Sequence, residues 1–240
     1  MIEFSNVTAR RGRRPVLHGV SLTVSSGEVV ALVGRSGSGK TTMLRLVNRM
    51  LPVDGGEVRV GGVAVAAWDP IELRRQTGYV IQDVGLFPHL SVGENIAIVP
   101  RLMQWNQQRI AERVDQLLAL VGLDAREFRA RRPHQLSGGQ RQRVGLARAL
   151  AADPPVLLMD EPFGALDAIT RAELHREFRR VQRAMHKTVL LVTHDLAEAF
   201  QLADRIAVLQ DGDIVACAPP GDLQESAHPF VRTLLETRFG

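Results

Sequence analysis

The sequence predicts an α/β fold with a parallel sheet core, an antiparallel β subdomain near the N-terminus and an inserted helical subdomain. The core is predicted from three short apolar runs, because strands covered on both faces of a sheet read as continuous hydrophobic stretches. The runs lie at 29–33, 156–160 and 188–193, and each leads directly into a glycine-rich turn or polar residues. Ligands of open α/β sheets bind beyond the carboxyl ends of the strands, so we expect a site at these three ends.

The antiparallel part is predicted from alternation. Apolar and polar residues alternate around Ile2 and again between 16 and 24, which indicates half-buried strands. Two short strands are expected in 57–65 on either side of Gly61-Gly62, a pair typical of tight hairpins. Asp211-Gly212 predicts another hairpin further along the chain.

From about residue 84 to 152 the apolar spacing changes to that of helices. One helix is predicted from residues that recur on a single face, namely Ile110, Val114, Leu117, Leu118 and Val121. Others are expected at 139–151, at 171–186 and, as one short helix, in the last twenty residues. We predict a single domain, 1–240, in which 1–83 and 153–240 form the α/β core with its β subdomain and 84–152 form the helical insertion.

Composition narrows the function classes. The formal net charge of +4 is too small and too dispersed to argue for nucleic acid, although Arg10, Arg11, Arg13 and Arg14 form a local cluster. The lone Cys217 excludes an internal disulfide and suits a reducing compartment. No apolar run reaches the ~18–20 residues of a membrane helix, and the first residues lack the features of a signal peptide. We therefore expect a soluble, cytoplasmic protein that reaches a membrane only through a partner.

Residues 34–42 follow the first apolar run and fit the phosphate-binding pattern G-x-x-x-x-G-K-[ST]. In order, they are Gly34, Arg35, Ser36, Gly37, Ser38, Gly39, Lys40, Thr41 and Thr42. Glycines let successive N–H groups curl around an anion, and the following helix directs its positive end at the same point. We expect Lys40 to contact the outer phosphates of a nucleotide and the Thr41 hydroxyl to be a ligand of Mg²⁺. Only Lys40 and Lys187 are lysines among the 30 Lys and Arg residues, which favours a specific need for an ammonium group at position 40.

Polar residues near other strand ends complete what phosphoryl transfer to water requires. Asp160 would hold Mg²⁺ through its water shell, and Glu161 would be the general base or the group that orients water. Gln82 and His194 would reach the attacking water and the γ-phosphate, and Gln82 also the metal. Taken alone, His194 reads as a hydrogen-bonded strand-end histidine, Gln82 as a solvated loop residue and Asp160-Glu161 as two surface acids. Their combination with the phosphate loop favours an ATPase.

A second glycine-rich segment, Leu136-Ser137-Gly138-Gly139-Gln140, opens the helix predicted at 139–151 and so forms a second anion site at a helix N-terminus. With this segment the chain resembles the ATP-binding subunit of an ABC transporter over essentially its full length. The matching parts are Gly34–Thr42 (Walker A), Gln82 (Q-loop), Leu136–Gln140 (signature), Val156–Asp160 with Glu161 (Walker B and catalytic glutamate), Ala165–Asp167 (D-loop) and His194 (switch histidine). The resemblance implies a P-loop NTPase core of the RecA-like type that binds ATP and Mg²⁺.

The resemblance also implies a head-to-tail dimer. Residues 137–140 of one chain would close on the ATP held by Lys40 of the other, which would explain why one chain carries two anion sites. A two-fold arrangement suits a surface that presents both half-sites. The family usually has an aromatic residue that stacks on adenine where this sequence has Arg11. A guanidinium can also stack on a base, and Arg10–Arg14 reads equally well as a solvated basic turn.

A finer resemblance concerns the transported solute. Residues 82–95 look like an importer-type Q-loop, a region that receives a coupling helix of the membrane subunit in that family. Residues 96–100 and 160–171 are similar to importers of quaternary amines such as glycine betaine and choline. The resemblance implies a bacterial subunit at the cytoplasmic face of the inner membrane, with permease subunits and a solute-binding protein as partners and no nucleic acid. Another small solute (an amino acid, a sugar or an anion), a role in DNA repair or translation, and a surface loop packed on its own helices at 86–88 stay open as alternatives.

Overall fold

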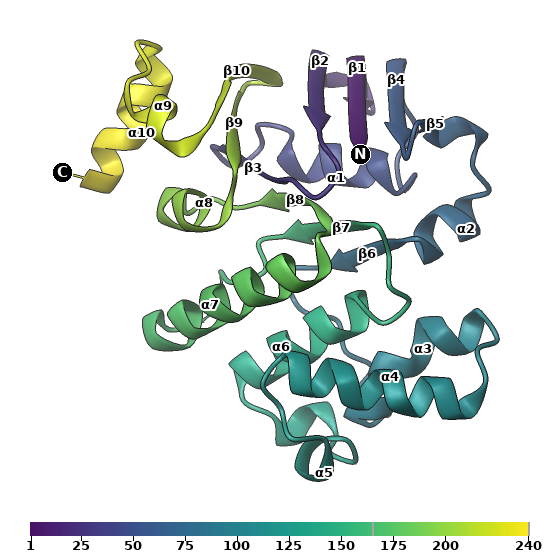
Figure 1. Cartoon of the computed structure of the whole chain (residues 1–240). Coiled ribbons are helices and arrows are strands. Elements are labelled where there is room, and N and C mark those ends of the chain that lie inside the picture. The colour runs from purple at the N-terminus through teal and green to yellow at the C-terminus, as the bar shows by residue number, and fades with distance from the viewer. Residues whose placement is uncertain (165, 240) are drawn as a thin grey trace. The chain divides into compact units, whose positions relative to one another are not determined.

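The computed structural model describes residues 1–164 and 166–239, the side chains of 237–239 excepted. The described chain forms two compact units. The first consists of Met1–Arg74, Leu158–Glu161 and the described part of His186–Gly240, and the second of Arg75–Leu157 and Pro162–Met185. Each unit is therefore assembled from segments that are far apart in sequence (Figure 1).

The first unit contains an antiparallel sheet with the strand order β2-β1-β4-β5. Its strands are β1 (Ile2–Arg11), β2 (Arg14–Val24), β4 (Gly55–Val60) and β5 (Val63–Ala64). β1 pairs with β2 on one side and with β4 on the other. The alternation of the sequence appears as alternating burial, since Ile2, Phe4 and Val7 face the core of the unit and the residues between them are half-buried or exposed.

The second sheet carries the apolar runs. β3 (Val29–Gly34) lies between β8 (Thr188–Val192) and β9 (Arg205–Gln210) and pairs in parallel with both. All residues of β3 and β8 are buried, as expected for strands covered on both faces. β10 (Asp213–Ala218) pairs antiparallel with β9 at one edge, and β7 (Val156–Asp160) follows β8 in the strand order. Because β3 and β8 are parallel, the residues that follow them leave the sheet at the same edge.

Helices complete the first unit. α1 (Lys40–Val47) contacts β3 and β8 and buries Met43, Leu44, Leu46 and Val47 completely. The other helices with residues in this unit are α2 (Pro70–Arg75), α8 (Leu196–Leu202), α9 (Pro220–Gln224), α10 (Pro229–Phe239) and the 3₁₀ turn Val65–Ala67.

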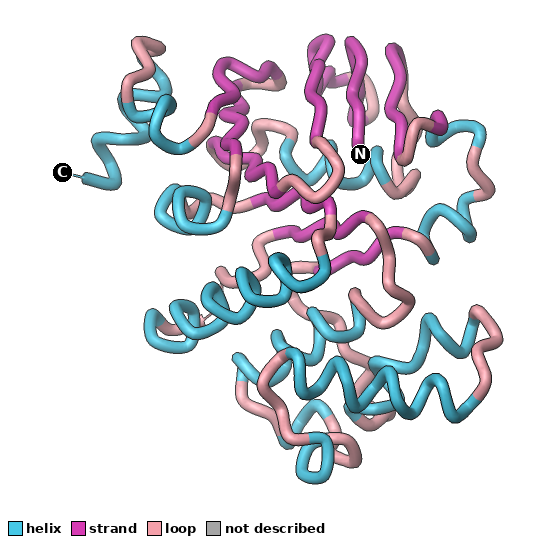
Figure 2. The backbone as a smooth tube through the Cα atoms, in the orientation of Figure 1, coloured by secondary structure: helices cyan, strands magenta, loops and turns pink. Residues whose placement is uncertain are grey.

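The second unit is mainly helical (Figure 2). It begins with β6 (Thr77–Val80), the neighbour of β7 in the strand order, and continues with helices. These are α3 (Val92–Leu102), α4 (Gln107–Leu120), α5 (Ala125–Phe128), the 3₁₀ turn Pro133–Gln135, α6 (Gly138–Ala149) and α7 (Ala168–Met185). α3, α4 and α7 all contact α6, which is therefore the central helix of this unit.

The predicted α/β fold with a parallel-rich sheet and an antiparallel sheet is confirmed, and the differences are local. α2, α3 and α8 were not expected from periodicity. The described residues from Pro220 to Phe239 form two helices, not the one short helix expected, because a residue before proline disfavours helical backbone and His228 precedes Pro229. The subdivision at residues 84 and 152 stays a prediction.

Candidate active site

The phosphate loop joins β3 to α1, and its glycines stand where a side chain would not fit. At Gly34 a Cβ would lie 2.2 Å from the carbonyl oxygen of Leu209 on the neighbouring strand β9. At Gly39 it would lie 2.6 Å from Cδ2 of Leu17, and the φ angle of Gly39 is +109°, in the region that favours glycine. The loop backbone is therefore confined to one tight path, as an anion cradle requires.

Lys40, the first residue of α1, turns its side chain back into the loop. Its Nζ donates to the carbonyls of Gly34 and Arg35, both at 2.8 Å, and the residue is only 6% exposed. Burial lowers the pKa of Lys40, and the charges of Glu161 and Asp160 partly offset this effect. The ammonium group is thus held within the loop beside two acids.

Ser38 is a buried member of the same loop. Within the described part of the chain, its hydroxyl has no hydrogen-bond partner although the residue is only 4% exposed. Buried polar groups are normally paired, and a phosphate oxygen in the loop would supply the missing acceptor. This orphaned donor is an observation that fits an anion in the loop.

The remaining loop residues face outward. Arg35, Ser36 and Gly37 are exposed, and Thr42 is half-buried on α1. The Arg35 guanidinium lies 5.5 Å from the centre of the Phe230 ring of α10, a cation–π contact that ties the loop to the C-terminal helix.

Thr41 and Asp160 bring a hydroxyl and a carboxylate together. Thr41 Oγ1 donates to Oδ1 of Asp160, the last residue of β7, at 3.0 Å. Oxygen ligands of this kind suit Mg²⁺, which is usually held by one or two protein groups together with waters and substrate phosphates. Among the described residues no three His, Cys, Asp or Glu side chains form a metal-binding group. The pair fits the predicted metal site.

Glu161 and His194 form a second pair. Oε2 of Glu161 lies 3.3 Å from Nδ1 of His194, which follows β8. Glu161 has a φ angle of +47°, and its N–H donates to the Val192 carbonyl at 2.9 Å. A non-glycine residue in the left-handed region is uncommon and needs such local support. The Glu161 side chain is 25% exposed and that of His194 61%, so both are open to a ligand.

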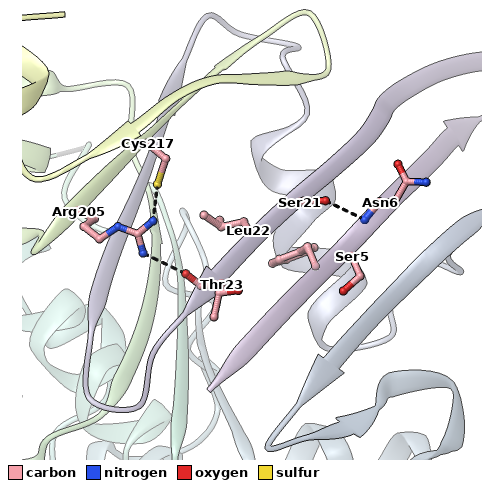
Figure 3. A pocket seen from close by; sticks show the side chains of 8 residues that line it. Ser5, Asn6, Ser21, Leu22, Thr23, Arg205 and Cys217 are labelled. Carbon is pink, nitrogen blue, oxygen red and sulfur yellow. Dashed lines mark hydrogen bonds between the residues drawn. The ribbon is translucent and has the colours of Figure 1, made fainter.

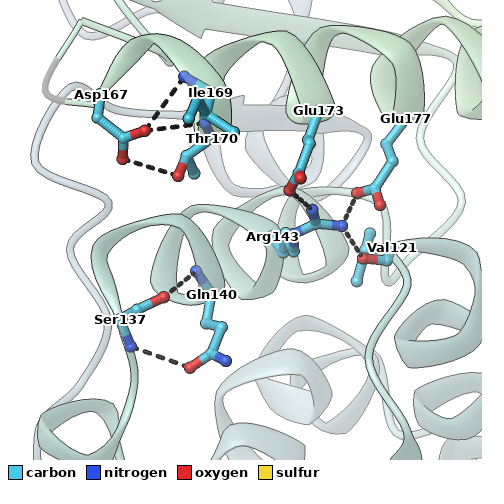
Figure 4. Close-up of polar contacts among 9 residues, drawn as sticks. All are labelled: Val121, Ser137, Gln140, Arg143, Asp167, Ile169, Thr170, Glu173 and Glu177. Atoms are coloured by element: carbon cyan, nitrogen blue, oxygen red, sulfur yellow. Dashed lines mark hydrogen bonds and ion pairs between the residues drawn. The ribbon is translucent and has the colours of Figure 1, made fainter.

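Gln82 and the signature lie in the second unit. Gln82 is exposed two residues after β6. Ser137 is the N-cap of α6 and forms a capping box with Gln140: the Gln140 N–H donates to Ser137 Oγ at 3.2 Å, and the Ser137 N–H to Gln140 Oε1 at 2.9 Å (Figure 4). Gly138 is exposed and Gly139 buried at the start of this helix of 12 residues. The signature is therefore an ordered helix N-terminus, as predicted.

Asp167 of the predicted D-loop caps α7. Its carboxylate accepts hydrogen bonds from the N–H groups of Thr170 and Ile169, at 3.0 and 3.2 Å, and from the Thr170 hydroxyl at 2.7 Å. The bonds from Thr170 and Ile169 lower the pKa of Asp167. Ala165, the first residue of the same predicted segment, lies outside the described residues.

Arg11 ends β1, is exposed, and pairs in register with Arg14 across the hairpin. This position is compatible with both predicted roles, the adenine contact and the solvated basic turn. The assignment of Arg11 to adenine stays a prediction.

Asn95 holds the Q-loop region in place through hydrogen bonds, a role that was not predicted from the sequence. It is fully buried, accepts from the Phe87 N–H at 2.8 Å, and donates to the carbonyls of Phe87, Leu90 and Ser91. These bonds fix the loop while leaving the Phe87 residue 45% exposed. The signal was the capping box Ser91-x-x-Glu94, a helix start that places Asn95 inside the first turn of α3.

A cavity of about 590 Å³ lies elsewhere in the first unit (Figure 3). It is lined by Phe4, Ser5, Asn6, Ser21, Leu22, Thr23, Arg205 and Cys217. Arg205 donates to Cys217 Sγ at 3.0 Å, and burial raises the pKa of that thiol. None of these residues belongs to the predicted site.

A model of the ABC transporter family matches residues 17–164, more than half of the chain. The chain belongs to the ABC transporter family. The matched range includes the phosphate loop, Gln82, the signature segment, Asp160 and Glu161. None of the described helices is both long and apolar enough to cross a membrane.

Relatives within the ABC family agree with this assignment. The ATP-binding protein YehX of a glycine betaine uptake system of Escherichia coli (strain K12) is 49% identical over 97% of this chain and 75% of its own length. The choline transport ATP-binding protein OpuBA of Bacillus subtilis (strain 168) is 46% identical over 98% of this chain, which spans only 62% of that protein. Among solved structures, the dimeric post-hydrolysis ATP-binding cassette MJ0796 bound to ADP and Pi has a TM-score of 0.79 at 33% identity, covering 92% of this chain and 99% of its own.

Proposed function

We propose that this chain is an ATPase whose first unit binds MgATP and whose hydrolysis powers the import of a small solute through a separate membrane permease. The observation that carries the proposal is the set of contacts at the sheet edge: Lys40 within the loop, Thr41 on Asp160, and Glu161 beside His194. Phosphoryl transfer depends on positioning and charge stabilisation, for which these groups are suited.

In this mechanism the loop N–H groups and the start of α1 bind the β- and γ-phosphates. The Nζ of Lys40 moves from the Gly34 and Arg35 carbonyls to phosphate oxygens, and the Ser38 hydroxyl gains its acceptor. When bound, Mg²⁺ would neutralise the negative charge that develops on the phosphates during hydrolysis. The Thr41 hydroxyl and the Asp160 carboxylate would be its protein ligands. Gln82, which is exposed after β6, is proposed as a further ligand of Mg²⁺.

Glu161 would orient or deprotonate the attacking water. His194 lies within hydrogen-bonding reach of the Glu161 carboxylate, so a proton shared between the two would fix the orientation of the carboxylate. His194 and Gln82 would then sense the γ-phosphate. The positive φ of Glu161 is the kind of strained backbone found at active sites.

The signature would act on a second copy of the chain. Residues 137–140 form an ordered helix start with an exposed glycine, a geometry that suits the phosphates of a partner's nucleotide. A head-to-tail dimer would place ATP between the phosphate loop of one chain and the signature of the other.

The proposed cargo is a quaternary amine such as glycine betaine or choline, because relatives named for glycine betaine, choline or carnitine transport are 44–49% identical to this chain. A sulfate/thiosulfate import ATP-binding protein of Nocardia farcinica is 44% identical as well, so an anion is the alternative cargo. The proposed partners are permease subunits, which would contact exposed Phe87, and a solute-binding protein. The chain would then lie on the cytoplasmic face of a bacterial inner membrane, without nucleic acid.

Reconstitution tests the proposal. The chain and its co-purifying membrane protein are placed in vesicles, and ATP-dependent uptake of labelled betaine, choline and carnitine is compared with that of sulfate, an amino acid and a sugar. Uptake of a quaternary amine that stops in the Glu161→Gln variant is the expected result. Co-purification with DNA or ribosomes in place of a membrane protein contradicts the transport proposal.

A further inference from the structure

The signature segment and the residues after Asp167 meet at the N-termini of α6 and α7. A Cβ at Gly139 would lie 2.4 Å from Cγ2 of Thr170, so only glycine fits there without movement. Thr170 is itself held by the Asp167 carboxylate through its hydroxyl and its N–H. The signature backbone at Gly139 therefore packs on the Thr170 side chain, and Figure 4 shows the hydrogen bonds by which Asp167 orients that side chain.

Arg143 lies four residues after Gly139, one turn further along α6 and on the same face of the helix. It makes a second connection between α6 and its neighbouring helices. Arg143 forms an ion pair with Glu177 of α7 and lies 3.5 Å from Glu173 of the same helix. Its Nη1 also donates at 2.9 Å to the carbonyl of Val121, which caps the C-terminus of α4. One guanidinium thus joins three helices.

This connection is largely buried. The side chain of Arg143 is 12% exposed and that of Glu177 23%. Gly122 leaves the necessary space, because a Cβ there would lie 2.8 Å from Glu177 Oε1 and 3.1 Å from Arg143 Nη1. A planar guanidinium can serve two carboxylates and a helix-terminal carbonyl at once, whereas a lysine ammonium cannot reproduce this geometry.

We propose that Arg143 is a positioning residue for ATP hydrolysis. It holds α6 against α7 and α4, and so fixes residues 137–140 relative to Asp167 in the arrangement that grips the nucleotide of a second copy. Arg143 acts through α6 and does not contact the nucleotide bound to its own phosphate loop. This inference rests on the proposed function, since the signature must act on a partner's ATP.

The test compares Arg143→Ala, Arg143→Lys and the charge swap Arg143→Glu with Glu177→Arg. Arg131→Ala is the matched control, since it removes an arginine of the same unit whose ion pair with Glu127 and stacking on the Phe128 ring both lie at α5. Nucleotide affinity of the isolated subunit should stay within a factor of about two, because the phosphate loop is unchanged. ATP-driven dimerisation, measured by sedimentation in a Glu161→Gln background, and the kcat of the otherwise unchanged protein should each fall about tenfold or more in Arg143→Ala. The lysine variant and the charge swap should recover part of this loss.

Measurements are made well below each variant's melting temperature, so that a loss of folded protein is not mistaken for a loss of positioning. If Arg143→Ala does not fold, Arg143→Lys carries the same comparison. A lowered melting temperature with unchanged dimerisation and kcat would show that the contact only stabilises the fold. That result would overturn this inference and leave the proposed function standing. If the Glu161→Gln protein with Arg143 intact does not dimerise with ATP, the proposed function fails and the inference with it.

Discussion

The Thr41 hydroxyl donates a 3.0 Å hydrogen bond to Oδ1 of Asp160, a residue 119 positions further along the chain. The bond links the start of α1 to the end of β7 and brings together two oxygen ligands of the kind that Mg²⁺ prefers. Because these two oxygens lie close together in the described structure, the predicted Mg²⁺ site can be tested by changing the Asp160 carboxylate alone.

Asp160→Asn removes the negative charge while keeping a side chain that can still accept a bond from Thr41. We expect Mg²⁺ to strengthen ATP binding in the unaltered protein. In the variant, the gain in ATP affinity caused by Mg²⁺ should be about tenfold smaller, since a neutral amide is a weak magnesium ligand. The measurement is an ATP titration with Mg²⁺ and with a chelator. Asp115→Asn, at an exposed ion pair with Arg129, serves as the control. An equal Mg²⁺ effect in Asp160→Asn and the unaltered protein would remove Asp160 from the metal site.

We predict that Lys40 makes nucleotide binding depend on pH. Burial lowers its pKa from the ordinary 10.5, and polyphosphate beside the ammonium would favour the charged form and raise the pKa again. ATP binding then takes up protons at pH values between the Lys40 pKa of the free protein and the Lys40 pKa of the ATP complex. ATP affinity should therefore be level below the free pKa and fall as pH rises through it, a sign opposite to that of a group whose pKa drops on binding.

Calorimetric titrations in buffers of different ionisation enthalpy, from about pH 7 to about pH 10, measure this proton uptake at Lys40. Lys40→Arg stays charged over that interval and should show no uptake wherever it still binds. Lys40→Ala should lose ATP binding, while Arg59→Ala, at an exposed pair with Glu57, should not. Binding by the unaltered protein without proton uptake at alkaline pH would argue against an ammonium–phosphate contact.

The glycines of the phosphate loop differ in what they avoid. Gly34 and Gly37 both have positive φ angles, but a Cβ would lie 2.2 Å from a backbone carbonyl at Gly34 and has nothing within 4 Å at Gly37. Gly34→Ala should therefore lose on the order of 3 kcal/mol more stability than Gly37→Ala, because β9 or the loop must move. Denaturant unfolding measures the difference. Equal losses of stability in the two variants would mean that the positive φ angle alone sets the cost of alanine, and not the contact with Leu209.

Much of this site could be predicted because its residues follow apolar strands directly in sequence. The phosphate loop after β3, Asp160 at the end of β7 and His194 after β8 needed only strand recognition and the rule on carboxyl ends of strands. The Arg143 contacts could not be predicted, because they depend on which faces of α4, α6 and α7 meet, and helical periodicity does not encode this. The orphaned Ser38 hydroxyl was equally hidden, since its burial is a property of the folded loop.

We predict that a substitution at Phe87 impairs transport without impairing ATP hydrolysis. The Phe87 residue is 45% exposed on a loop whose backbone is held by Asn95 of α3, so part of this residue is presented to solvent. Apolar anchors of this kind contribute strongly when a partner covers them. Phe87→Ala should leave stability and the basal ATPase rate of the isolated chain nearly unchanged, and should reduce uptake in vesicles containing the permease by about tenfold or more. The matched control is Leu102→Ala, which removes another exposed apolar side chain, at the end of α3. Normal uptake by the Phe87 variant would show that the loop is not the surface on which the membrane partner sits.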